Sequence, residues 1–150
     1  MKLWMIFVLG AFLAWGCYVP MLHEGQMAFK GGSLRAFLWV GLAYFVTAVL
    51  VPLALMATGM EPWQFNSRGI SFSFIAGVLG AAGALFVILS MKFGGSPLVV
   101  APIVFAGAPV VNALVSTAWH KPKNPPELWF YAGLALAALG AFLVLRFRPT

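Results

Sequence analysis

A short run of polar side chains interrupts the apolar segment 98–119 on what would be one helical face. Pro109, Asn112 and Ser116 stand at positions i, i+3 and i+7, which a helix brings to the same side. Pro102 lies seven residues further back on that stripe. A proline leaves a carbonyl without its helical donor, and an amide both donates and accepts. This face is a candidate site for a small polar solute, or equally for a hydrogen bond that holds helices together.

The pair His23 and Glu24 forms a second candidate, directly after the first apolar segment and Pro20. If the helix continues past that proline, both side chains face the bundle near one membrane surface. There they would form an entrance, where Glu24 would titrate with a transported proton or bind a cation. The alternative is a solvated helix end. No carboxylate lies near the middle of an apolar segment, which argues against a buried proton-exchange acid.

Three aromatic residues with polar ring atoms, Trp15, Tyr18 and Tyr44, are candidates to line a pocket. The motifs of enzymes are missing from the sequence: it has no Gly-x-Ser-x-Gly, no His-Glu-x-x-His and no phosphate-binding glycine loop. With one cysteine, Cys17, and no aspartate, we expect neither a disulfide framework nor a metal cluster. We therefore expect no catalytic residues, no metal and no cofactor, and a protein that is not an enzyme.

These candidate residues are carried by five hydrophobic segments that fill most of the 150-residue chain. Hydrophobic residues make up 63% of the sequence and charged residues 8%, with every charge at or beyond a segment end. About 20 apolar residues in a helix span a hydrocarbon core near 30 Å thick. The sequence predicts an all-α membrane protein, a single domain and bundle of five transmembrane helices, over residues 3–22, 34–57, 72–91, 98–119 and 128–145.

The net charge of +6 is interpreted as a topology signal, because the basic residues stand in short connections at membrane ends. We expect no nucleic-acid partner, since no basic face exists apart from those ends. Five spans put the two termini on opposite sides of the bilayer. One side collects Lys2, Arg68, Lys121, Lys123 and the terminal amine; the other collects Lys30, Arg35, Lys92, Arg146 and Arg148.

Because positive charge normally accumulates on the cytoplasmic side, this balance specifies the orientation weakly. Insertion in both orientations would give an antiparallel homodimer. The alternatives are that a simple charge count is too crude to give the orientation, or that a partner fixes it. Small residues recur at every fourth position on two expected helices. These are Ala76, Gly80 and Ala84 on one, and Gly133, Ala137 and Ala141 on the other. In lipid such stripes favour close helix packing.

Several stretches of the chain form a recognisable set: the Trp15-Gly16 pair, Gly83–Phe86, Met91–Pro97, Val100–Pro102, Ala108–Leu114 and the glycine-containing run 132–140. In these motifs, in length and in helix number, the chain resembles one EamA-type half of the drug/metabolite transporter superfamily. The Trp15-Gly16 pair is similar to a Trp-Gly early in many members. Where family halves carry a Gly-Glu pair after the fourth helix, this chain has Trp119-His120-Lys121-Pro122. Any coupling role of that glutamate is therefore not carried over.

The resemblance implies a multi-pass transporter in the cell membrane that moves a small polar or amphipathic metabolite. Two halves would surround a midplane site, so the partner would be a second copy or a paralogous half-transporter. The substrate-binding residues would be Trp15, Tyr18, Tyr44, Pro109, Asn112 and Ser116, with His23 and Glu24 at an entrance. The alternative is a non-transporting membrane subunit or scaffold of a larger complex, in which Asn112 is structural and the small-residue stripes bind partners.

Overall fold

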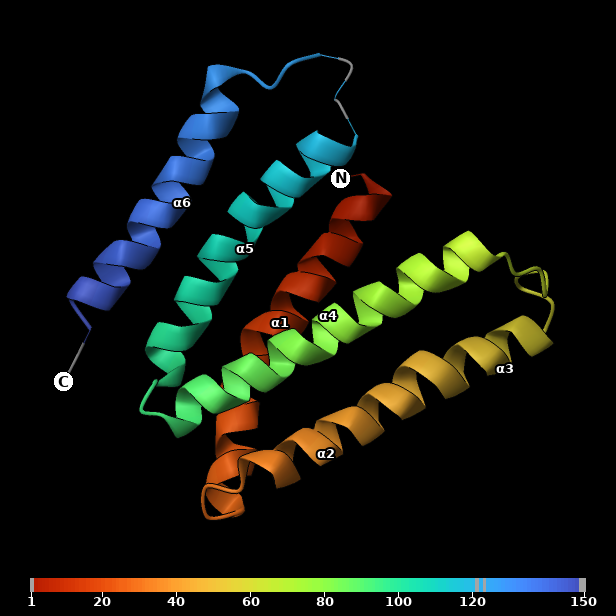
Figure 1. The fold of residues 1–150 in the computed structure, drawn as a ribbon, viewed down its shortest axis with the longest axis horizontal. Coiled ribbons are helices and arrows are strands. Elements are labelled where there is room, and N and C mark those ends of the chain that lie inside the picture. Colours follow the sequence, from red (N-terminus) through yellow and green to blue (C-terminus); the bar gives the residue numbers. More distant parts are fainter. Residues whose placement is uncertain (1, 121, 123, 149–150) are drawn as a thin grey trace. The chain divides into compact units, whose positions relative to one another are not determined.

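The computed structural model describes residues 2–120, 122 and 124–148, and its regular structure in these residues is entirely helical. Lys121 and Lys123, which the charge count includes, lie outside the described residues. The elements in chain order are α1 (Leu3–Ala28), α2 (Ser33–Phe45), the π-helix η1 (Val46–Leu50), α3 (Val51–Ala57), α4 (Ser67–Lys92), α5 (Pro97–Trp119) and α6 (Leu128–Arg146) (Figure 1).

Five helical stretches of the described residues are long and apolar enough to cross a membrane, with α2, η1 and α3 forming one continuous stretch from Ser33 to Ala57. The other four stretches are α1, α4, α5 and α6. The prediction of an all-helical, multi-pass membrane protein with five spans is confirmed at this level. That the five helices form one domain stays a prediction.

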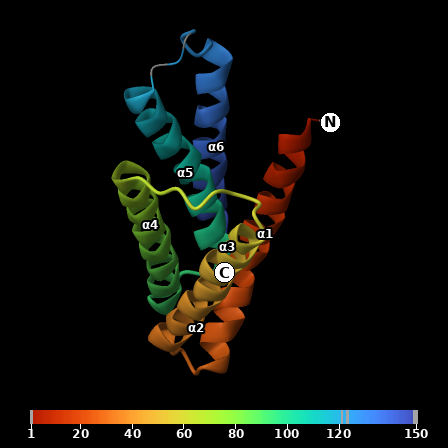
Figure 2. The same cartoon turned by 90° about the vertical axis from the view of Figure 1, so that its right-hand side faces the viewer.

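Helix α1 does not end at Leu22, where the apolar segment ends, but continues through Pro20 to Ala28 (Figure 2). Proline removes one backbone hydrogen bond, and the intact bonds on either side let the helix continue. The polar residues after Leu22 remain helical because a helix satisfies its own backbone whether or not lipid surrounds it. The extension places His23, Glu24 and Gln26 on α1 rather than in a loop.

The second span contains a π-helical turn that the hydrophobic pattern does not reveal. Residues Val46–Leu50 form η1, and Pro52 follows at the start of α3. Proline lacks the N–H that would bond to the carbonyl of Ala48, and its ring clashes with that carbonyl in a regular α-helix. Widening the preceding turn relieves the clash. The Thr47 hydroxyl donates to the Ala43 carbonyl at 2.8 Å within the same stretch.

Helix α4 begins five residues before the apolar segment, at Ser67 instead of Phe72. Asn66 caps it, because its Oδ1 accepts a hydrogen bond of 2.8 Å from the Gly69 N–H. Helix α5 begins with Pro97 in the first turn, where the missing N–H has no helical partner to lose. Cap chemistry, not hydropathy, sets these helix starts.

The described residues group into two compact units, and the division passes through α1. Residues up to Gly16 belong with those from Gly95 onward, and Cys17–Gly94 form the other unit. In the first unit α5 and α6 lie side by side and antiparallel (Figure 1). On α6, Ala137 and Ala141 of the predicted small-residue stripe are half-buried, while Gly133 is exposed, with no atom near the position of a Cβ.

The second unit has its buried residues at one end. They come from the C-terminal part of α1, the start of α2 and the last turns of α4: Val19, Leu22, Gln26, Ser33, Ala36, Ala84, Val87, Ile88 and Met91. Helix α2 packs against α4. Of the predicted small-residue stripe on α4, Ala84 is buried in this core, whereas Ala76 and Gly80 are exposed.

Candidate functional site

The polar face of α5 lies exposed in the first unit. Pro109, Asn112 and Ser116 are all exposed, and the Ser116 hydroxyl donates to Asn112 Oδ1 over 3.5 Å. A hydrogen bond of that length is weak, so both side chains keep most of their capacity to bind other groups. Pro109 adds an acceptor, because the carbonyl of Phe105, four residues earlier, loses the N–H that it would bond in a regular helix.

The half-buried residues of α5 follow a different stripe from the polar face. Ala106, Val110 and Ala113 are half-buried, and they point roughly 90° around the helix from the centre of the polar residues. The packed stripe and the polar face are thus neighbours on one helix. Packing within this unit leaves Asn112 and Ser116 uncovered.

Trp15 of α1 contacts the same side of α5. Its ring lies edge-on to that of Phe105, with centroids 6.1 Å apart and an interplanar angle of 70°. Phe105 precedes Asn112 by seven residues, so both project from one face, two turns apart. The structure therefore brings Trp15 to the polar face of α5. Sequence reasoning missed Phe105, although its i−7 spacing from Asn112 was the available signal.

The remaining aromatic candidates belong to the other unit. Tyr18 on α1 is half-buried and its hydroxyl group is shielded from solvent, while Tyr44 on α2 is exposed. The six predicted substrate-binding residues are thus divided between the units. Trp15, Pro109, Asn112 and Ser116 lie in one unit, and Tyr18 and Tyr44 in the other. The substrate-binding role of all six stays a prediction.

His23 and Glu24 lie on α1, beyond Pro20, as the entrance hypothesis requires. His23 is half-buried and Glu24 is exposed. Among the described residues no group of three or more His, Cys, Asp and Glu side chains is placed to hold a metal ion. The pair therefore offers one carboxylate and one imidazole near the end of α1, and its entrance role stays a prediction.

A buried polar cluster in the second unit was missed altogether. The Gln26 amide Nε2 donates to Ser33 Oγ and to the Ile88 carbonyl, both at 3.1 Å, and the Ser33 hydroxyl donates to the Gly31 carbonyl at 3.4 Å. Gln26 and Ser33 are each 4% exposed. The Gln26 Oε1 atom is buried and has no partner among the described residues. The cluster joins α1, the α1–α2 turn and α4.

An open cavity of about 170 Å³ lies in the second unit, between the end of α3 and the turn that follows it. Its lining residues are Pro52, Leu55, Met56, Met60 and Glu61. Pockets for drug-sized ligands typically measure roughly 300–1,000 Å³. This cavity is too small for such a ligand, and none of the predicted site residues lines it.

Comparison of the chain with protein-family models, with curated proteins and with solved structures finds no match. The fold and the polar faces described above are therefore the basis for a functional proposal.

Proposed function

We propose that this protein is a half-transporter of the drug/metabolite type, which pairs with a second copy or a paralogous half to move a small polar or amphipathic metabolite. The observation that supports this is the uncovered amide and hydroxyl of Asn112 and Ser116 on α5. Polar groups that face hydrocarbon are costly, and they normally face a partner helix or a cavity that admits water. In a transporter that cavity is the substrate site.

The chemistry of this face favours a neutral or zwitterionic substrate that combines an amide or hydroxyl with an apolar ring. Asn112 and Ser116 donate and accept hydrogen bonds, and the Phe105 carbonyl, to which Pro109 offers no N–H, can accept one. The Trp15 ring, which is 44% exposed, offers an apolar surface next to them. No carboxylate lies on this face to select a cation.

The test of the substrate site uses the full chain in detergent and in liposomes, with nicotinamide (an amide on a ring) and L-tyrosine (a hydroxyl on a ring) as first probes. We expect one probe class to raise the thermal stability of the protein and to enter liposomes in its presence. Asn112→Leu should abolish both effects and leave the oligomeric state intact. Val111→Leu, a neighbouring change outside the polar face, should preserve both. Equal responses of the two variants would contradict the proposal.

The orientation of the pair has its own test. In a Cys17→Ala background, one cysteine is added after the C-terminal residue and labelled with an impermeant thiol reagent from each side of native membranes. Two populations, labelled from opposite sides, would support an antiparallel homodimer. Labelling from a single side would exclude the antiparallel homodimer, and the half-transporter would then need a paralogous partner of opposite orientation.

A second candidate function, a scaffold subunit of a larger membrane complex, is favoured by one observation on α4. At Gly77, Gly80 and Gly83 no atom lies within 4 Å of the position that a Cβ would occupy. These glycines leave open backbone for another helix to approach closely. On this alternative Asn112→Leu weakens assembly and Gly80→Leu abolishes it, whereas a transporter half keeps its oligomeric state with Asn112→Leu.

A further inference from the structure

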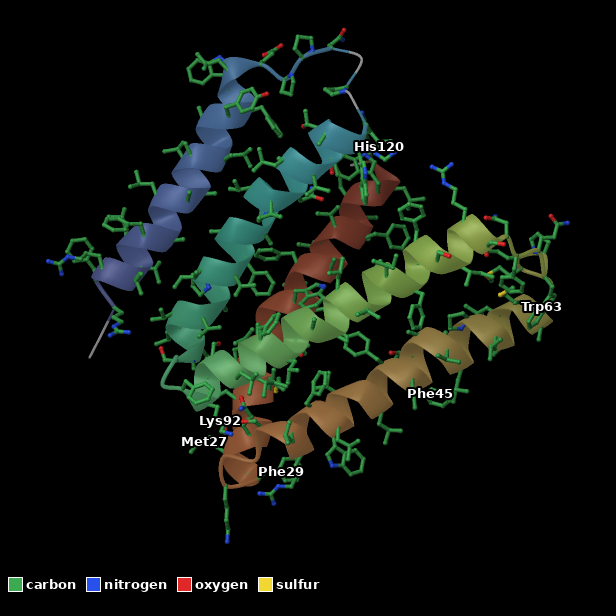
Figure 3. All side chains as sticks on the ribbon, in the orientation of Figure 1. Met27, Phe29, Phe45, Trp63, Lys92 and His120 are labelled. Carbon is green, nitrogen blue, oxygen red and sulfur yellow. The ribbon has the colours of Figure 1, made fainter. Side chains whose placement is uncertain are left out.

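Three basic residues gather at the end of the second unit where α1 turns into α2. Lys30 and Arg35 belong to this turn and to the first turn of α2, and Lys92 ends α4. The hydrogen bond from Gln26 to the Ile88 carbonyl joins the end of α1 to α4, and Lys92 follows Ile88 by about one helical turn. Figure 3 shows Lys92 with Met27 and Phe29 at this end. We name Lys30, Arg35 and Lys92 the basic end.

Lys30 holds a backbone conformation that normally selects glycine. The Gly31 N–H donates to the Gln26 carbonyl and the Lys30 N–H to the Met27 carbonyl, both at 2.8 Å, which is the Schellman pattern of a helix C-terminus. Lys30 occupies its left-handed position with a φ of 52°. It is the one non-glycine residue with positive φ among those described. A strained position held by a charged residue is a reason to seek a function for that charge.

Arg35 is fixed over the turn by its own contacts. Its Nη2 donates to the Phe29 carbonyl at 2.8 Å, and its guanidinium carbon lies 5.7 Å from the centre of the Phe29 ring. The guanidinium also covers Gly32, where a Cβ would come within 2.5 Å of the Arg35 Nε. Guanidinium groups carry five N–H donors in a rigid fork that matches a phosphate. The contact to Phe29 uses one of them.

The positive charge of the basic end is not balanced by the described residues. No carboxylate of the described residues pairs with Lys30, Arg35 or Lys92. Glu61 and Glu127 lie far from these residues in sequence, and Glu24, six residues before Lys30 on α1, forms no ion pair with them. The C-termini of α1 and α4 each contribute about half a negative charge and the N-terminus of α2 about half a positive one. Three full positive charges exceed these partial charges and the one carboxylate of Glu24 taken together, so an anion is favoured.

The ends of membrane-spanning helices lie at the level of the lipid headgroups, so a lipid phosphate is the anion that is present at this position. The Phe93 ring, 80% exposed, stands beside Lys92 with the ammonium 5.8 Å from its centre, and Phe29 lies beneath Arg35. Such rings suit the boundary between headgroups and acyl chains. We propose that the basic end binds the headgroup phosphate of an anionic phospholipid, between Lys30, Arg35 and Lys92. This proposal does not depend on the transport function.

The experiment measures binding of phosphatidylglycerol to the full chain in a neutral detergent, by native mass spectrometry and by the shift in unfolding temperature. Phosphatidylcholine and inorganic phosphate are the comparison ligands. We expect phosphatidylglycerol to bind and to stabilise the protein more than either comparison ligand. Equal stabilisation by phosphatidylcholine would overturn the proposal, and equal stabilisation by inorganic phosphate would assign the site to a free anion instead of a lipid.

Variants of the three residues locate the site. A charge near the membrane surface contributes roughly a fivefold change in affinity for anionic lipid, so Lys30→Gly, Arg35→Gln and Lys92→Gln should each weaken binding by about that factor. Lys30→Gly is the sharpest variant, because glycine suits the left-handed turn and the fold should persist. Gly32→Ala keeps every charge but displaces the guanidinium, and should also weaken binding.

Arg68 supplies the matched control. It lies at the opposite end of α4, and its guanidinium carbon is 5.8 Å from the centre of the Phe72 ring, much as Arg35 lies over Phe29. Among the described residues of this unit, no other lysine or arginine is close to Arg68 in sequence. Arg68→Gln should change the affinity for phosphatidylglycerol by less than about twofold, because no cluster is lost. A loss as large as that of Lys30→Gly would overturn the proposal, since it would show a general effect of net charge.

Discussion

The side-chain amide of Gln26 donates a hydrogen bond of 3.1 Å to the main-chain carbonyl of Ile88, 62 residues away. Both residues are buried, and the same amide also donates to Ser33 Oγ. One side chain thereby joins the end of α1, the start of α2 and the last turns of α4. In a membrane protein, where apolar helices gain little by hiding apolar surface from water, such a cluster specifies how helices meet.

The Gln26–Ser33 hydrogen bond should appear as a coupling energy. Gln26→Leu and Ser33→Ala each remove it, and each should lower the free energy of unfolding by about 0.5–2 kcal/mol. Because they remove the same bond, the double variant should lose less than the sum, by roughly 0.5–1.5 kcal/mol. Unfolding in mixed micelles measures the free energy of unfolding of the wild type, the two single variants and the double variant. Ser90→Ala, which removes a bond to Val87 within α4, is the control. Additive losses would contradict the role of the pair.

Two neighbouring substitutions in the α1–α2 turn should change the stability of the protein in opposite directions. Gly31 has a φ of 77°, so Gly31→Ala should destabilise the protein by about 1 kcal/mol. Lys30→Gly should stabilise it by up to about 1 kcal/mol, because φ of 52° costs lysine more than glycine. Gly25→Ala, inside α1 with no atom near the added Cβ, should stabilise by roughly 0.5–1 kcal/mol. The same unfolding assay checks all three signs.

The contact of Trp15 with Phe105 should be measurable as a second coupling. An edge-to-face aromatic pair contributes about 0.5–1.5 kcal/mol beyond the burial of its rings. A double-mutant cycle of Trp15→Leu and Phe105→Leu should return a coupling in that range. In a background where the other five tryptophans are replaced by phenylalanine, Trp15 fluorescence gives an independent readout. Phe105→Leu changes the surroundings of Trp15, whereas Phe142→Leu, an exposed change on α6, should leave its emission unchanged. A coupling energy of zero would contradict the contact between Trp15 and the polar face of α5.

The π-helical turn in the second span should depend on Pro52. Pro52→Ala restores the N–H that a regular helix donates to the Ala48 carbonyl, so η1 should convert to α-helix. The variant should be more stable, by up to about 3 kcal/mol, the usual difference between alanine and proline inside a helix. Carbon-13 chemical shifts and amide exchange of residues 46–52 report the change. A π-turn that persists in Pro52→Ala would show that Pro52 is not its cause.

The helix ends show why part of the fold was beyond the hydrophobic pattern. The five spans were predictable, because crossing a bilayer depends on the summed hydropathy of about 20 consecutive residues. The end of α1 was not: the pattern ended at Leu22, but a helix bonds its own backbone and continues through polar residues to Ala28. The early start of α4 depends on one cap hydrogen bond from Gly69 to Asn66.

The candidate sites divide in the same way. The polar stripe of Pro109, Asn112 and Ser116 could be predicted from helical spacing, and these residues do share an exposed face of α5. The contact of Trp15 with Phe105 on that side of α5 could not be predicted, because it requires α1 and α5 to meet at the level of these two residues. Gln26 was overlooked because it stood beyond the expected end of the first helix. On a longer helix it continues the buried stripe of Val19 and Leu22.

By itself the sequence determined an all-helical membrane protein with five spans, and the faces on which its few polar residues lie, because hydropathy and helical periodicity are properties of consecutive residues. Only the tertiary structure decided that Gln26 is buried against Ile88, that Ala84 packs while Gly80 stays open, and that the last turns of α4, which Lys92 ends, meet the end of α1. Those relationships depend on which helices meet and at what level along their axes. Contacts between helices, and not the local sequence pattern, determine the energy of each such arrangement.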